Sequence, residues 1–243
     1  MDNPHLERYA SDVVESIDAG LPVPAYVGGW NVGVIYGYEG DGSTALARGY
    51  FGREDPQSVP LKDMPPFLVF LAGYDDPPAA RAVLRRTLEV ATKHWREDGG
   101  AWGETKYMHG KAVYDRWLAA LDDVESIPED DLPGFRHVSM WTYETLFNAR
   151  EAAGKFLRSQ APLLDGEARD ALTRAAELYE EEHALLMESL DQKGALMHRF
   201  GGVEADGWTR EGLARERGVL ARAAELEEQA ITAIEQALAA MDR

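Results

Sequence analysis

The sequence predicts an α+β protein, in which a small antiparallel sheet is followed by a larger α-helical region that ends in a long antiparallel helix pair. Side chains over Asn31–Tyr38 alternate with the period of two expected for a strand. From Ala79 onward, apolar residues recur with the period of about 3.6 expected for helices. We therefore expect a β-rich region over residues 1–76 and a helical region over residues 77–243 that packs on it.

The β-rich region is predicted to be one helix followed by strands. Asp41-Gly42 has the composition of a two-residue hairpin turn, which requires positive φ angles. One face of the strand before this turn is expected to carry Val32, Val34, Tyr36 and Tyr38. The predicted elements are a helix over Leu6–Asp18 and strands over Pro22–Val27, Asn31–Tyr38, Thr44–Phe51 and Phe67–Leu71.

The helical region is predicted to contain no strand after Ala79. Leu132–Gly134 and Pro162–Gly166 are interpreted as breaks between helices, because they combine proline and glycine. The predicted helices are Ala79–Arg96, Tyr107–Asp122, Phe135–Gln160, Gly166–Arg199 and Thr209–Met241.

The last two predicted helices each carry an apolar stripe with three-four spacing, which predicts that they fold back on each other as an antiparallel pair. The first stripe consists of Leu172, Ala176, Tyr179, Leu186, Leu190 and Met197. The second stripe consists of Leu220, Ala224, Ile231, Ile234, Leu238 and Met241.

The composition excludes several classes of function. The formal net charge of −18 repels nucleic-acid phosphates and anionic lipids, so neither nucleic acid nor a membrane is an expected partner. No apolar run reaches the roughly 20 residues that span a bilayer. The chain contains no cysteine, which excludes thiolate chemistry and disulfides and fits a cytoplasmic protein.

Two segments are dense in residues that suit a site. Tyr107–Trp117 combines aromatic rings with hydrogen-bonding groups; either it packs on the sheet, or it forms a pocket wall with residues 99–103 as a lid. In Arg136–Phe147, His137 and Glu144 are seven residues apart and share a helix face. They are either a core hydrogen-bonding pair or a pair that handles a proton.

A metal site is not expected from the remaining histidines. Glu180 and His183 have the i, i+3 spacing of carboxylate-bridged dimetal sites, but no second Glu-x-x-His pair accompanies them. We therefore interpret His183 as a core residue, and we expect neither a metal nor a cofactor.

Four segments together resemble the proteins around the butirosin-biosynthesis acyltransferase BtrH, which are themselves similar to C39-type, papain-like cysteine peptidases. These segments are Ile17–Val23, the hairpin of Trp30–Phe51, Tyr107–Trp117 and Arg136–Leu146. The resemblance implies a partial papain-like core with an appended helical region and a ligand cleft where the two meet.

The better-known members of that group transfer acyl groups or cleave peptides through an N-terminal cysteine. The resemblance implies that the segment with this nucleophile would precede the present chain, and it places Asn31 where the base histidine would stand. Asparagine cannot accept a proton near neutral pH. The hairpin is then either purely structural or one side of a cleft that still binds a ligand beside Asn31.

The leading hypothesis is a non-catalytic protein that binds a small polar or peptide-like ligand in a cleft between sheet and helices. One alternative is a hydrolase or acyltransferase that uses His137 or His109 with Glu144. Another is a homo-oligomeric module, such as a homodimer, that associates through the C-terminal helices. The ligand-binding candidates implied by the resemblance are Asn31, Tyr107, His109, Tyr114, His137, Trp141, Tyr143 and Glu144.

Overall fold

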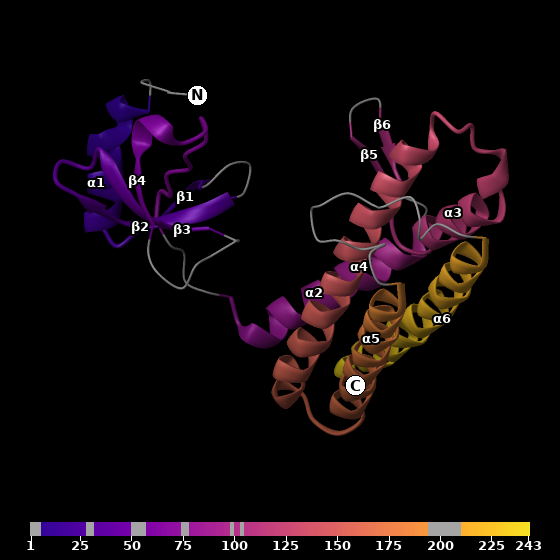
Figure 1. The fold of residues 1–243 in the computed structure, drawn as a ribbon. Helices are drawn as coiled ribbons and strands as arrows, with labels where there is room; N and C mark the ends of the chain where they lie inside the picture. The colour runs from indigo at the N-terminus through magenta and orange to yellow at the C-terminus, as the bar shows by residue number, and fades with distance from the viewer. Residues whose placement is uncertain are drawn as a thin grey trace. The chain divides into compact units, whose positions relative to one another are not determined.

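The computed structural model is an α+β structure with two compact units, Met1–Pro77 and Pro78–Arg243 (Figure 1). The structure describes residues 6–27, 32–49, 57–73, 78–97, 100–102, 105–193 and 210–243.

The first unit contains a four-stranded antiparallel sheet in the order β1-β2-β3-β4. Each strand pairs with its neighbour in sequence, which is the simplest antiparallel topology. Its helix α1 contacts β1 and β2. The elements are the 3₁₀ helix Glu7–Tyr9, α1 (Ala10–Asp18), β1 (Val23–Tyr26), β2 (Val32–Glu39), β3 (Thr44–Arg48), β4 (Gln57–Pro60) and the 3₁₀ helix Leu61–Asp63.

The hairpin between β2 and β3 differs in detail from the predicted one. Glu39 pairs with Thr44, so the connection is the longer loop Gly40–Ser43, and the prediction of a two-residue turn was wrong. Gly40 and Gly42 both have positive φ, 61° and 90°, which favours glycine. The composition therefore indicated a turn, although the loop length depends on the strand register.

The predicted alternation along β2 is visible in its burial. Ile35 is fully buried, whereas Val32, Val34 and Tyr36 on the other side of the strand are exposed. The register shifts between Ile35 and Gly37, so Tyr36 lies in a bulge. The core of this unit lies on the Ile35 side, between the sheet and α1.

The predicted strand Phe67–Leu71 is not formed. This segment makes only an isolated bridge, in which Leu68 pairs with Ala25. The Val69 amide donates to the Pro24 carbonyl at 2.9 Å, but Pro24 has no N–H to return a bond on that edge. A ladder therefore cannot extend along this edge of β1, and the fourth strand is instead β4, which was not predicted.

The second unit is mainly helical. Its elements are α2 (Ala80–Arg96), β5 (Gly100–Trp102), β6 (Thr105–Tyr107), α3 (Lys111–Asp122), the 3₁₀ helix Val124–Ser126, α4 (Leu132–Gln160), the 3₁₀ helix Ala161–Leu163, α5 (Gly166–Lys193) and α6 (Arg210–Met241). Helix α6 packs against α5, α2 and α3, and α4 packs against α5.

Two boundaries in this unit correct the prediction. The short hairpin of β5 and β6 occupies a stretch where no strand was expected, so the third helix begins at Lys111 instead of Tyr107. Helix α4 begins at Leu132, because Pro133 lies in its first turn, where a backbone N–H has no helical partner in any case. The predicted end of the fifth helix, Gly166–Arg199, lies outside the described residues, as do all residues from 194 to 209.

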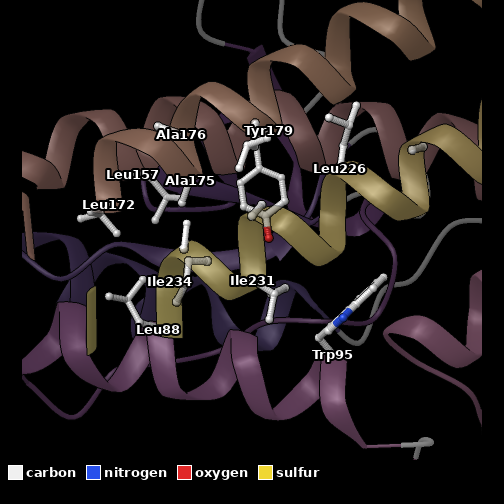
Figure 2. Close-up of a cluster of buried hydrophobic side chains, with 14 of the residues drawn as sticks. Leu88, Trp95, Leu157, Leu172, Ala175, Ala176, Tyr179, Leu226, Ile231 and Ile234 are labelled. Atoms are coloured by element: carbon white, nitrogen blue, oxygen red, sulfur yellow. The ribbon is translucent and has the colours of Figure 1, made fainter. Parts of the chain in front are cut away.

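The predicted pairing of the last two helices is confirmed: α5 and α6 run side by side (Figure 1). Ion pairs join Glu167 to Arg243 and Glu181 to Arg222, so the two helices are antiparallel. Tyr179 from α5 and Ile231 and Ile234 from α6 are among the buried residues between them (Figure 2). None of the described helices combines the length and apolar character needed to span a membrane.

Candidate functional site

The helical unit contains a pocket of about 550 Å³, here called the aromatic pocket. Cavities that hold small molecules are typically 300–1,000 Å³ in volume and lined mainly by apolar and aromatic groups. The aromatic residues that line this pocket are Trp95 from α2, Tyr114 and Trp117 from α3, Trp141 from α4 and Tyr179 from α5.

The walls of the aromatic pocket are held by packing between helices. Trp95 and Tyr114 meet edge to face, with ring centroids 5.8 Å apart. Trp95 also lies beside Ile231 of α6, and the hydroxyl of Tyr179 is directed toward α6 (Figure 2). The indole N–H of Trp95 donates to Glu228 at 2.7 Å. These contacts fix the rings on several helices at once, so the pocket is largely preformed.

One end of the pocket is bounded by charged side chains that were not predicted. Arg150 of α4 lies between Glu182 of α5 and Glu227 of α6, and we call these three residues the buried ion cluster. The Arg150 Nε–H donates to Glu182 Oε1 at 3.1 Å, and Arg150 Nη2 forms an ion pair with Glu227 Oε2. The side chains of Glu182 and Glu227 are only 0% and 6% exposed.

Two tyrosines complete the cluster. The Tyr114 hydroxyl donates to Glu182 Oε1 at 2.7 Å, and the Tyr179 hydroxyl donates to Glu227 Oε1 at 2.9 Å. Burial is the main reason that the pKa values of both tyrosines are raised well above their ordinary value. Both phenols therefore stay protonated and act as donors. Four helices, α3 to α6, contribute to this network.

The cluster contains two carboxyl groups and one guanidinium group. Burial raises the pKa of Glu182 to about 8, because the Arg150 charge only partly offsets desolvation and the Glu227 charge adds to it. Burial alone would lower the pKa of Arg150, but Glu227 and Glu182 raise it, so the guanidinium stays charged. Glu182 Oε2 has no hydrogen-bond partner among the described residues and is the natural place for the proton.

This protonation makes stability dependent on pH. Since the folded-state pKa of Glu182 is raised, its stabilising contribution is complete below its ordinary value of 4.5 and is lost as the pH rises toward about 8. We expect Glu182→Gln, which cannot ionise, to gain stability relative to the wild type between about pH 5 and pH 8. Urea unfolding at several pH values measures the difference.

The matched control for this prediction is Glu180→Gln on the same helix. The Arg158 hydrogen bonds lower the pKa of Glu180 below 4.5, so Glu180 is ionised throughout the range from about pH 5 to pH 8, and the stability difference between Glu180→Gln and the wild type should be constant there. A constant difference between Glu182→Gln and the wild type across the pH range would contradict the assignment.

The aromatic pocket also borders a buried donor without an acceptor. Trp117 is 8% exposed, and its indole N–H has no hydrogen-bond partner among the described residues. An unsatisfied buried polar group costs about 1–3 kcal/mol. Trp117, Val113 and Thr142 also line a second hollow of about 300 Å³ between α3 and α4. The two hollows therefore share Trp117 as a wall, and its N–H is buried away from both.

Of the predicted ligand-binding residues, Tyr114 and Trp141 line the aromatic pocket. Tyr143 is fully buried in the core instead, and its hydroxyl donates to the Leu186 carbonyl at 2.8 Å. Asn31 lies outside the described residues, as does the side chain of Tyr107.

The candidate catalytic residues are not joined to one another. His137 Nε2 accepts a hydrogen bond from the Trp141 indole N–H at 3.0 Å, so this nitrogen is already used. No hydrogen bond links Glu144 to His137 or His109 in the part of the chain that the structure describes. His109 stacks on His94 with ring centroids 4.8 Å apart and bonds to the His94 carbonyl through Nδ1.

The Glu180 and His183 pair does not form a metal site. Glu180 pairs with Arg158, and His183 Nδ1 lies 3.0 Å from the Phe147 carbonyl oxygen. Within the described residues, no group of three or more histidine, aspartate or glutamate side chains is arranged to hold a metal. His183 is half-buried, and its interpretation as a core residue stays a prediction.

The fold and the site define an α+β protein whose helical unit carries a ligand-sized aromatic pocket beside a buried ion cluster. Comparisons of the chain with protein-family models, with curated proteins and with solved structures found no match. The resemblance to the BtrH group and to papain-like enzymes therefore stays a prediction.

Proposed function

We propose that this protein binds a small, partly apolar molecule in the aromatic pocket of its helical unit. The observation that carries the proposal is the combination of a ligand-sized cavity and five aromatic walls. The apolar part of a bound molecule would cover these rings.

The proposal keeps the small-molecule ligand of the leading hypothesis, but it rests on the helical unit alone. The cleft between sheet and helices stays a prediction, as do a cytoplasmic location and association through the C-terminal helices. The enzyme alternative also stays a prediction. It gains no support from the geometry of the described residues, because Trp141 occupies His137 Nε2 and no hydrogen bond joins Glu144 to either histidine there.

Filling the pocket should abolish binding. Ala149 of α4 lines the pocket, and a tryptophan at this position would occupy much of its volume. We expect the neutral fluorescent probe N-phenyl-1-naphthylamine to bind the wild type saturably and to bind Ala149→Trp at least about tenfold more weakly. A fluorescence titration measures both affinities.

The matched control is Ala152→Trp on the same helix. Ala152 is exposed and does not line the aromatic pocket, so this variant should bind the probe like the wild type. Circular dichroism checks that both variants remain helical. Equal binding by all three folded proteins, or no saturable binding by the wild type, would refute the proposed function.

A further inference from the structure

The charges around the aromatic pocket indicate which kind of molecule it takes. Arg150 carries the single positive charge of the buried ion cluster, and Glu182 and Glu227 both lie within ion-pair distance of it. With both carboxyl groups ionised, the cluster has one negative charge in excess. Glu227 lines the pocket directly, whereas Glu182 lies behind the Tyr114 hydroxyl.

The aromatic walls favour the same sign of ligand charge. The faces of tryptophan and tyrosine rings attract cations, and this attraction is strongest where water is excluded. The guanidinium of Arg150 already lies over the Tyr179 ring, 5.6 Å from its centroid, which shows that this wall accommodates a cation. An anionic ligand would meet Arg150, but the two carboxylates already bonded to it would repel that ligand.

We propose that the ligand of the aromatic pocket carries a positively charged amine or ammonium group, held near Glu227 and the Tyr114 hydroxyl and enclosed by the aromatic walls. This inference rests on the proposed function and specifies its ligand class. The apolar part of the ligand would lie along Trp117 and Trp141, toward the hollow between α3 and α4.

Binding of a cation should be linked to the proton of the ion cluster. The groups that face Glu182 are Tyr114 from α3, Arg150 from α4, Tyr179 from its own helix and Glu227 from α6. A cation in the pocket supplies the positive charge that the proton on Glu182 otherwise supplies. Amine binding should therefore strengthen as the pH rises from about 6 to about 9, a range in which alkylamines remain protonated.

Three probes with similar carbon skeletons test the ligand charge. 4-Phenylbutylamine is a cation, 4-phenylbutanol is neutral and 4-phenylbutyrate is an anion at pH 8. Competition against N-phenyl-1-naphthylamine gives the affinity of each for the intact protein. We expect the amine to bind about tenfold or more tightly than the alcohol, and the carboxylate to bind most weakly.

Variants that neutralise one carboxylate test which side chain causes the preference for the amine. Glu227→Gln removes the surplus negative charge at the pocket surface, so the amine should lose its advantage while the alcohol is unaffected. Glu182→Gln also removes one negative charge from the buried ion cluster, at a position behind the Tyr114 hydroxyl. This variant should in addition abolish the pH dependence of amine binding. It serves as the second variant if Glu227→Gln does not fold.

The outcomes separate this inference from the proposed function. If the neutral probe binds but the amine and the alcohol compete equally, the pocket is a binding site and the charge assignment is wrong. If the carboxylate competes best, Arg150 is the anchoring group and the charge assignment is again wrong. An amine preference that persists unchanged in Glu182→Gln and Glu227→Gln would also overturn it.

Discussion

Replacing Arg150 by methionine is expected to lower the free energy of unfolding by about 3–5 kcal/mol, because it leaves the Glu227 carboxylate buried without its counter-ion and removes the hydrogen bond to Glu182. Methionine approximates the length of the arginine stem, so the loss reports the charge and its hydrogen bonds more than a cavity. Urea denaturation of the wild type and the variant at about pH 7 measures the difference.

A matched control lies on the same pair of helices. Arg158 of α4 pairs with Glu180 of α5, but these side chains are 50% and 45% exposed, so Arg158→Met should cost much less stability than Arg150→Met. Adding Glu182→Gln and Glu227→Gln to the Arg150→Met variant should restore part of the lost stability. Equal losses for Arg150→Met and Arg158→Met would contradict the assigned burial.

Gly110→Ala is expected to be the other strongly destabilising change. Gly110 precedes α3 with φ 60° and ψ −139°, a conformation that residues with a side chain rarely adopt. A Cβ atom at this position would lie 2.2 Å from the His94 carbonyl oxygen and 2.6 Å from the Trp95 Cα atom. Backbone strain and overpacking each cost about 1–3 kcal/mol, so we expect a loss of about 3 kcal/mol or more.

Gly218→Ala, in the same unit, is expected to change stability in the opposite direction. Gly218 is an exposed residue inside α6. A Cβ atom added at this position would have no neighbour within 4 Å in the described structure. Alanine is favoured over glycine in a helix by up to about 1 kcal/mol, so this variant should be slightly more stable than the wild type. Thermal unfolding of both variants compares them. A neutral effect of Gly110→Ala would show that the loop before α3 is wrongly placed.

Much of the fold follows from local sequence patterns. The alternation over β2 and the three-four stripes of α5 and α6 are strong signals, since each repeats over several residues. The errors occur where register or neighbouring backbone decides the outcome. Pro24 prevents a ladder with Phe67–Leu71, and the first turn of α4 tolerates Pro133.

The candidate site was only partly predictable. Tyr114 and Trp141 come from two segments rich in aromatic groups and line the aromatic pocket, and their role in binding a ligand stays a prediction. Tyr143 lies in the core instead, since neighbouring positions of a helix that is apolar on several faces cannot be assigned to core or pocket from spacing alone.

The buried ion cluster was missed, although the sequence contains a signal for it. Glu227 falls between Ala224 and Ile231 in the three-four series of α6, and Arg150 follows Phe147 at the same spacing in α4. Opposite charges at core positions of two helices in one bundle predict a buried pair. Glu182 carried a weaker signal, because the neighbouring His183 fits the apolar series of α5 equally well.

Binding of amines in the aromatic pocket beside Arg150, Glu182 and Glu227 can be seen in a crystal structure. We suggest a crystal of the protein with 4-(4-bromophenyl)butylamine, in which anomalous scattering locates the bromine. We expect a bromine peak against Trp117 or Trp141 and the amine nitrogen within hydrogen-bonding distance of Glu227. A peak elsewhere, or an empty pocket at saturating amine, would contradict this expectation.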